Sequence, residues 1–256
     1  MIRAAFFDVD GTLLSFGTGQ VRDSARETIR RLQERGIACV VATGRHYRQL
    51  KRLPVGDIPF DAYITLNGQI CLDREGKLFH GVPIRGAMRE RILQMFRSRE
   101  HPILLQEQER MILNHVTDHV REVQALINSP IPPLGDPGEE PFYQAAVYVR
   151  RKDQDAFRKL LPECVVTSWS SEGVDVIARD GGKVNGIRAY LNLWNIAPED
   201  TVAFGDGEND LDMLRFAGIG VAMGNAVKAV KEAADYVTAD IDDDGILKAA
   251  LHLGLI

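Results

Sequence analysis

Two aspartates follow the first apolar run of the chain, in the sequence Asp-Val-Asp-Gly-Thr at residues 8–12. Residues 4–7 are wholly apolar, which is typical of a strand buried on both faces of a parallel sheet. Side chains two residues apart in an extended chain point the same way, so the Asp8 and Asp10 carboxylates can face one site. Neighbouring carboxylates repel each other unless they share a proton or a cation, and Mg²⁺ prefers oxygen ligands. The pattern favours a magnesium site at this strand end over the alternatives, a helix cap or a solvated turn.

A second acidic segment, Gly-Asp-Gly-Glu-Asn-Asp at residues 205–210, also comes directly after a largely apolar run, residues 201–204. It resembles the Gly-x-Gly-x-x-Gly fingerprint of dinucleotide-binding folds, but Asp210 occupies the third glycine position. Its acids would repel a pyrophosphate, whereas acids at a strand end can hold a cation. We therefore expect Asp206 to complete the magnesium site, while Asp210 can also cap the helix that follows.

A third segment could bind phosphate. Thr-Gly-Arg at residues 43–45 follows the apolar run 37–42 and is expected to open a helix. The Thr43 hydroxyl and the free backbone N–H groups of such a turn, that of Gly44 among them, suit an anion. The alternative is an ordinary helix cap, since threonine is common there.

The fourth segment holds a single lysine, Lys183, in the sequence Asp-Gly-Gly-Lys-Val. It is not a Walker loop, because Ile177 and Val184 stand where that loop needs glycine and a hydroxyl residue. A lone lysine is usually a solvated surface residue. Lys183 is therefore a candidate site residue only because the other three segments are present.

Two segments could be mistaken for calcium loops, which need glycine at the sixth position and a bidentate glutamate at the twelfth. Counted from Asp8, these positions hold Leu13 and Gly19. Residues 240–245 (Asp-Ile-Asp-Asp-Asp-Gly) match the first half of the loop, but Leu251 stands at the twelfth position. We expect these acids to cap and charge the start of the last helix instead.

The composition sets broad limits on the class of protein. The 256 residues are 45% hydrophobic and 26% charged, as in an ordinary globular protein. A net charge of -5 argues against nucleic acid as the main partner, without excluding a basic pocket for a small phosphorylated ligand. Neither a signal peptide nor a membrane span is expected, and the three cysteines have no metal-ligand or redox spacing. These features predict a cytoplasmic protein.

The two ends of the chain have the pattern of an α/β fold, and the middle has that of an α+β fold with a Pro- and Gly-rich loop at 130–141. The simplest architecture is a core built from both ends, with a second domain inserted between them. Strands are expected at 4–7, 37–42, 62–66, 69–72, 77–80, 102–114 (two strands), 144–149, 165–169, 174–178, 201–204 and 219–221. Helices are expected at 24–34, 87–97, 117–128, 154–161, 182–193, 210–216, 226–234 and 245–253.

Taken together, the four segments resemble the motifs of the haloacid dehalogenase (HAD) superfamily in their order and context. Residues 8–12 look like motif I, Thr43 like motif II, Lys183 like motif III and residues 205–210 like motif IV. The resemblance spans the whole chain, and motifs I and IV are specific when they occur together.

The long insertion between motifs II and III, with Asn-Gly at 67–68 ahead of it, is similar to that of the Cof-type phosphatases. This resemblance implies an α/β fold in which a Rossmann-like parallel-sheet core, residues 1–81 and 182–256, carries an inserted α+β cap domain, residues 82–181, that sets substrate specificity. One departure lies at residues 184–185 (Val-Asn), where many relatives have glycine directly after the lysine.

The resemblance further implies a magnesium-dependent phosphatase acting on a small phosphorylated metabolite. Asp8 would attack phosphorus and become an aspartyl-phosphate, and Asp10 would protonate the leaving oxygen and later deprotonate water. Mg²⁺ would be held by Asp8, Asp206 and the backbone carbonyl of Asp10. Asp210 would support these ligands. The phosphoryl oxygens would be held by Thr43, Gly44, Lys183 and Asn209.

Two other functions stay open. A phosphomutase of the same superfamily would share these motifs, and a non-catalytic module that binds a phosphorylated metabolite would be expected to lack Asp8 or Asp10. The substrate could be a sugar phosphate or a phosphorylated cofactor, and core and cap could suffice as a monomer. Candidates for specificity on the cap are Arg110, His115, Tyr143 and Trp169.

Overall fold

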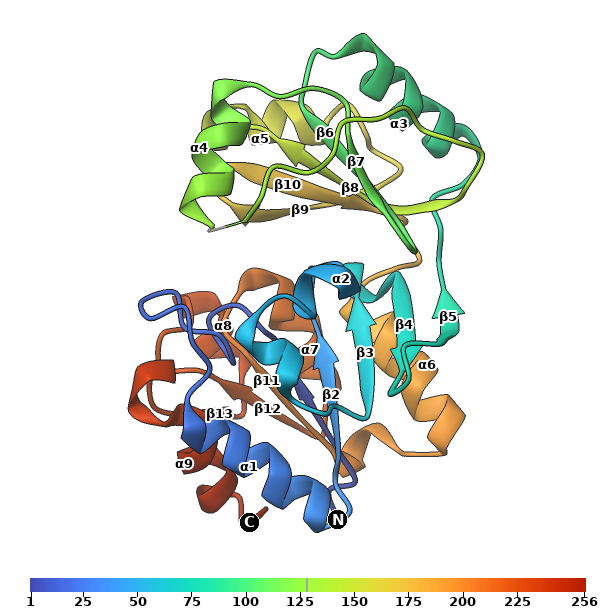
Figure 1. Cartoon of the computed structure of the whole chain (residues 1–256). Coiled ribbons are helices and arrows are strands. Elements are labelled where there is room, and N and C mark those ends of the chain that lie inside the picture. Colours follow the sequence, from blue (N-terminus) through green and yellow to red (C-terminus); the bar gives the residue numbers. More distant parts are fainter. Residues whose placement is uncertain (128) are drawn as a thin grey trace. The chain divides into compact units, whose positions relative to one another are not determined.

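The structure is a computed structural model that describes residues 1–127 and 129–256. The chain forms two compact units, one of Met1–His80 with Lys183–Ile256 and one of Gly81–Gly182 (Figure 1). The α/β core interrupted by an α+β insertion is thus confirmed. The predicted insertion, 82–181, is one residue shorter at each end, because Gly81 and Gly182 belong to the second unit.

Eight strands form the sheet of the first unit: β1 Ala4–Phe7, β2 Ala38–Ala42, β3 Ala62–Thr65, β4 Ile70–Asp73, β5 Leu78–Gly81, β11 Thr201–Gly205, β12 Ile219–Ala222 and β13 Tyr236–Val237. Their order is β13-β12-β11-β1-β2-β3-β4-β5. β1 lies between two parallel neighbours, since Phe7 pairs with Val41 of β2 and with Phe204 of β11. β4 runs antiparallel to β3.

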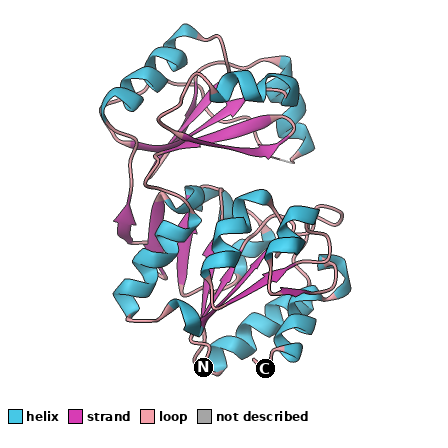
Figure 2. Cartoon of the chain, turned by 180° about the vertical axis from the view of Figure 1, so that it is seen from behind, coloured by secondary structure: helices cyan, strands magenta, loops and turns pink. Residues whose placement is uncertain are grey.

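Helices cover both faces of this sheet, which is why β1 is buried along its whole length (Figure 2). They are α1 Asp23–Glu34, α2 Tyr47–Leu50, α6 Lys183–Trp194, α7 Leu211–Phe216, α8 Lys228–Ala233 and α9 Gly245–His252. On one face, Ile187 of α6, Met213 of α7 and Val230 of α8 join the apolar core. On the other, α1 packs beside α9, and its Ile29 carbonyl lies 3.8 Å from the Cys39 thiol of β2.

Gly186 explains how α6 approaches the sheet so closely. A Cβ at this position would lie 2.5 Å from the Ile64 side chain and 3.1 Å from the Cα of Gly68. α6 therefore requires glycine at residue 186, where the helix meets β3 and the turn after it.

The second unit is an antiparallel sheet of five strands in the order β7-β6-β8-β10-β9. The strands are β6 Ile103–Glu107, β7 Met111–Leu113, β8 Phe142–Tyr148, β9 Val165–Ser170 and β10 Gly173–Ile177, and the helices are α3 Gly86–Ser98, α4 Asp118–Leu126 and α5 Arg151–Arg158. Neighbouring residues of β6 serve opposite faces: Leu105 packs with α3 and α5, and Leu104 packs with α4.

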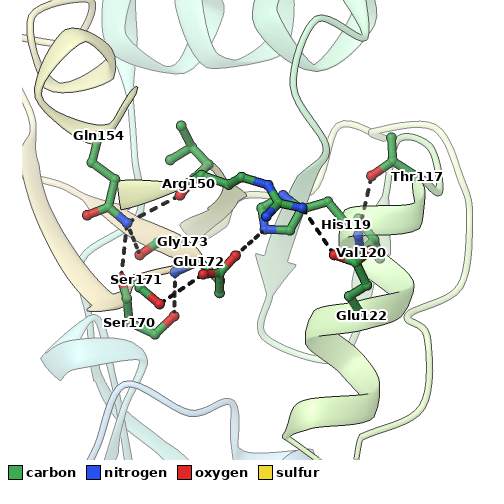
Figure 3. Close-up of polar contacts among 11 residues, drawn as sticks. Thr117, His119, Val120, Glu122, Arg150, Gln154, Ser170, Ser171, Glu172 and Gly173 are labelled. Atoms are coloured by element: carbon green, nitrogen blue, oxygen red, sulfur yellow. Dashed lines mark hydrogen bonds and ion pairs between the residues drawn. The ribbon is translucent and has the colours of Figure 1, made fainter. Parts of the chain in front are cut away.

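Polar contacts fix the turn between β9 and β10 from two helices (Figure 3). His119 of α4 bonds through Nε2 to the Glu172 carboxylate at 2.9 Å. Gln154 of α5 donates its Nε2–H to the carbonyl oxygen of Ser170 at 3.0 Å. The turn is thereby held against the rest of this unit.

Several local predictions were wrong. The helix expected to open at Thr43–Arg45 begins only at Tyr47 and lasts one turn, because the His46 side chain accepts a hydrogen bond from the Arg48 N–H and caps it there. The short edge strand β13 was missed. The helix expected at 117–128 ends at Leu126, and residue 128 lies outside the described residues. None of the helices in the described residues is long and apolar enough to cross a membrane.

Candidate active site

Three neighbouring strands of the first unit end at one edge of its sheet, and each is followed by a candidate residue. Asp8 follows β1, Thr43 follows β2, and Asp206 follows β11. Asp8 and Thr43 are buried, and Asp206 is partly buried. The carboxyl ends of parallel strands are where ligands of open α/β sheets bind. The topology thus gathers residues from distant parts of the chain at one place.

Lys183, the first residue of α6, binds one member of this group and a fourth carboxylate, Asp210. Its Nζ donates to Oδ1 of Asp8 and to Oδ1 of Asp210, both at 2.6 Å, and its side chain is only 2% exposed. Burial alone would lower the pKa of Lys183, but the charges of Asp210 and Asp8 raise it above its ordinary value. The lysine is therefore a fixed buried cation.

Asp210 and Thr12 hold the acidic loop in place. Oδ2 of Asp210 accepts hydrogen bonds from the backbone N–H groups of Asp206 and Gly207, both at 3.0 Å. The expectation that Asp210 caps the helix that follows was wrong: its side chain makes no capping bond to α7 and instead holds the turn before it. Thr12 Oγ1 donates to Oδ1 of Asp206 at 3.0 Å. Gly11 has a φ of +81°, and a Cβ there would lie 2.2 Å from Oδ2 of Asp206. This turn of the first motif accordingly requires glycine.

The carboxylates of Asp8, Asp206 and Asp210 form a cluster in which one oxygen of each lies within 4.8 Å of the others. If all three are ionised, Lys183 balances one charge and two negative charges remain. Burial and the Asp210 carboxylate raise the pKa of Asp8 well above its usual range and that of Asp206 to about 7. Hard oxygen donors with two unbalanced negative charges fit a divalent cation such as Mg²⁺.

This crowding predicts how the stability of the metal-free protein depends on pH. A carboxyl whose pKa is about 7 in the folded state and about 4 in the unfolded state destabilises the fold as pH rises between those values. We expect the unfolding temperature in EDTA to fall between about pH 4 and pH 7, and Asp206→Asn to flatten that fall. The exposed Asp212→Asn serves as control. An unchanged slope in Asp206→Asn would contradict the prediction.

Asp10 does not join this cluster. Its carboxylate forms a bidentate ion pair with Arg45, Nε to Oδ2 at 2.6 Å and Nη2 to Oδ1 at 2.7 Å. Burial would lower the pKa of Arg45, but the hydrogen bonds and charge of Asp10 raise it overall. Metal binding through the backbone carbonyl of Asp10 stays a prediction.

The remaining phosphate-binding candidates lie in the loops after β2 and β11. Thr43 Oγ1 accepts a hydrogen bond from the N–H of Arg45 at 3.2 Å. A Cβ at Gly44 would lie 3.1 Å from the side-chain amide of Asn67. The backbone N–H of Asn67 donates to the Thr43 carbonyl at 2.9 Å. Asn209 is exposed, with its side chain against Gly207. Their contact with a phosphate stays a prediction.

Sequence reasoning missed three residues of this region: Arg45, Thr12 and Asn67. Arg45 stands within the motif Thr-Gly-Arg and Thr12 within Asp-Gly-Thr. A cation and a hydroxyl group inside motifs already assigned to the site could have indicated both residues. Asn67 has a φ of 53°, which places it in the left-handed region that asparagine tolerates.

The four specificity candidates of the second unit make ordinary local contacts. Arg110 pairs with Glu107 in the β6–β7 hairpin, with Nη2 to Oε1 at 2.9 Å, and Nδ1 of His115 lies 3.0 Å from Oδ1 of Asn114. Tyr143 is buried, and Trp169 is partly buried against Tyr148, with which it forms an edge-on ring contact. Contact with substrate stays a prediction for all four.

Comparison with known proteins identifies the class. Residues 5–249 match the family of haloacid dehalogenase-like hydrolases, so this chain belongs to that family. It is 31% identical to YkrA of Bacillus subtilis (strain 168), a candidate phosphatase by name, over 98% of this chain and 97% of that protein.

Two solved structures are similar over nearly the full length. The phosphatase BT1666 from Bacteroides thetaiotaomicron has a TM-score of 0.90 and 32% identity, covering 100% of this chain and 96% of that one. The sugar phosphatase BT4131, of HAD subclass IIB, has a TM-score of 0.88 and 31% identity, covering 99% and 100%. The predicted superfamily, Cof-type group, fold and phosphatase class are confirmed.

Proposed function

We propose that this chain is a magnesium-dependent phosphatase that hydrolyses a small phosphorylated metabolite through an aspartyl-phosphate at Asp8. The observation that carries the proposal is the cluster of the Asp8, Asp206 and Asp210 carboxylates, two of which bind the buried Lys183. With all three carboxyls ionised, two negative charges are left unbalanced, and a divalent cation beside the carboxylate that would act as nucleophile would balance them. Without such charge, an anionic phosphate would be repelled from this edge of the sheet.

Asp8 and Asp206, with the backbone carbonyl of Asp10, would hold the cation. Bound there, Mg²⁺ would supply the positive charge that lets a phosphate approach the Asp8 carboxylate. Lys183 orients Asp8 through the 2.6 Å hydrogen bond to Oδ1 and adds a second positive charge next to the reacting group. Asp210 fixes Lys183 from its other side.

The reaction would run in two displacements. An Asp8 oxygen forms a bond to phosphorus while the bond from phosphorus to the leaving oxygen breaks, and Asp10 gives that oxygen a proton. Asp10 then takes a proton from a water molecule while the oxygen of that water attacks phosphorus. The bond between Asp8 and phosphorus breaks, which releases inorganic phosphate and restores the Asp8 carboxylate. Thr43, Gly44 and Asn209 would hold the phosphoryl oxygens in transit.

The substrate class we favour is a sugar phosphate. Its support is the likeness to a sugar phosphatase at 31% identity over essentially the whole chain. A phosphorylated cofactor is the other class expected from the sequence.

The test is phosphate release from p-nitrophenyl phosphate and from a panel of sugar phosphates and phosphorylated cofactors, with Mg²⁺ and with EDTA. We expect turnover with Mg²⁺ and a loss of roughly a hundred-fold or more in EDTA. Restored activity on adding Mg²⁺ back is the control for damage by EDTA. Transfer of the phosphoryl group between positions of a sugar, without release, would instead favour a phosphomutase. No turnover by folded, metal-bound protein would refute the proposal.

A further inference from the structure

Arg45 makes a contact that the proposed reaction does not yet use. Its guanidinium binds both oxygens of Asp10, at 2.6 and 2.7 Å. The two side chains are 19% and 28% exposed, so the pair is partly shielded from water but open to a ligand. A bidentate pair of this kind fixes the direction of a carboxyl group as well as its position.

The backbone of Arg45 is held on both sides. Its N–H donates to Thr43 Oγ1 at 3.2 Å, and its carbonyl accepts the N–H of Leu66 at 3.1 Å. β2 and β1 are neighbours in the sheet, so the loop that begins at Thr43 lies beside the turn that carries Asp10. The guanidinium is therefore presented to Asp10 from a fixed position, although 35 residues separate the two.

We infer that Arg45 is a positioning residue that orients Asp10 for proton transfer to the leaving group, an inference that rests on the proposed phosphatase function. A carboxyl group offers about four lone-pair positions, and a bidentate arginine occupies one on each oxygen. The remaining positions can serve the leaving oxygen and then the attacking water. Free rotation of Asp10 about its side-chain torsions would misdirect both transfers, which require a separation of about 2.6–3.2 Å.

If Arg45 positions Asp10, the loss of activity on replacing Arg45 should depend on how basic the leaving group is. An alkoxide is strongly basic and needs the proton from Asp10 as its bond to phosphorus breaks. The p-nitrophenolate ion is weakly basic and leaves without one. kcat/KM reports the steps up to departure of the leaving group, so it isolates this first transfer from the later attack of water.

The experiment compares kcat/KM of wild type, Arg45→Ala and Arg45→Lys on p-nitrophenyl phosphate and on the best sugar phosphate of the panel, with saturating Mg²⁺. For both variants we expect a loss of roughly a hundred-fold on the sugar phosphate and only a few-fold on p-nitrophenyl phosphate. Millimolar guanidinium should restore part of the sugar phosphate activity of Arg45→Ala. In an Asp10→Asn background, Arg45→Ala should add no further selective loss.

Arg22→Lys is the matched control, because Arg22 forms an ion pair with Asp244 at 2.7 Å in the same unit. It should leave both activities unchanged. Equal losses on the two substrates, with a raised KM, would overturn the inference and assign Arg45 to phosphate binding. Equal losses with a lowered unfolding temperature would overturn it in favour of a structural role. Absence of all activity in wild type would instead refute the proposed function itself.

Discussion

Asp8→Asn is expected to lower kcat for phosphate release by roughly 10⁴-fold or more, for every substrate that the wild type hydrolyses. The amide has nearly the shape of the carboxylate but lacks the anionic oxygen that would attack phosphorus. Initial rates with p-nitrophenyl phosphate and with a sugar phosphate, at saturating Mg²⁺, measure the effect. A loss confined to one substrate would not fit a shared nucleophile.

The same variant should remain folded. Burial and the neighbouring carboxylates raise the pKa of Asp8, so a neutral side chain avoids the cost of a buried charge and relieves repulsion. Lys183 keeps its hydrogen bond to Asp210 at 2.6 Å. We therefore expect the unfolding temperature of Asp8→Asn in EDTA to equal or exceed that of the wild type. A marked decrease would attribute lost activity to misfolding.

Trapping the intermediate tests the nucleophile directly. Trypsin cuts after Arg3 and Arg22, so Asp8 and Asp10 fall on one peptide, residues 4–22. Asp10→Asn should accumulate phosphate on this peptide with p-nitrophenyl phosphate, because water is no longer activated for the second displacement. Asp8→Asn should carry none. Phosphate on another peptide would contradict the assignment of Asp8.

The grouping of candidate residues at the carboxyl ends of β1, β2 and β11 was predictable, because it depends only on the topology of the sheet. Parallel strands place their carboxyl ends side by side, so an apolar run followed by a polar residue marks the same edge wherever it occurs. This placed Asp8, Thr43 and Asp206 together although they are scattered along the chain. Gly11 was part of the predicted motif, and its φ of +81° beside Asp206 shows why that position needs glycine.

Pairing between side chains could not be predicted in the same way. Lys183 is 175 residues from Asp8, and its contact with both Asp8 and Asp210 depends on where α6 packs on the sheet. Arg45 was visible in its motif, but only the folded loop shows that it binds Asp10. Local patterns report the element to which a residue belongs, and long-range packing decides its partner.

The acidic segment 240–245 shows the same limit. The acids were expected to cap the last helix, but Asp240 caps the short helical turn before it, by accepting a hydrogen bond from the Asp242 N–H. Asp244, at a φ of 54°, instead accepts hydrogen bonds from Ser24 and Arg22 near the start of α1. The Asp244 carboxylate ties the start of α1 to the loop before α9, a role that depends on the packing of these two helices against each other.

Lys183→Met should produce the largest loss of stability among single changes at the site. It removes a cation whose side chain is 2% exposed and leaves the Asp8 and Asp210 side chains, 8% and 0% exposed, without their charged partner. Removing one member of a buried ion pair typically costs about 3–5 kcal/mol. Methionine fills a similar volume, so most of this cost would be electrostatic. Phosphatase activity should be lost as well, since Asp8 would no longer be oriented.

Urea denaturation in EDTA measures this cost. The chain has two tryptophans, so a Trp169→Phe background leaves Trp194 of the first unit as the fluorescence probe. Lys248→Met is the matched control, because Lys248 pairs with Asp243 at 2.8 Å while the two side chains are 47% and 69% exposed. Its cost should stay below about 1 kcal/mol.

Two changes of condition, pH and Mg²⁺, distinguish an electrostatic from a packing origin of the stability loss in Lys183→Met. At acidic pH the clustered carboxyls are protonated and need no counter-charge, so the destabilisation should shrink relative to that at pH 8. Saturating Mg²⁺ should restore part of the lost stability at pH 8, since it would neutralise the same carboxylates. A loss that is equal at both pH values and insensitive to Mg²⁺ would show that Lys183 stabilises the fold by packing. The charge balance on which the proposed metal site rests would then be wrong.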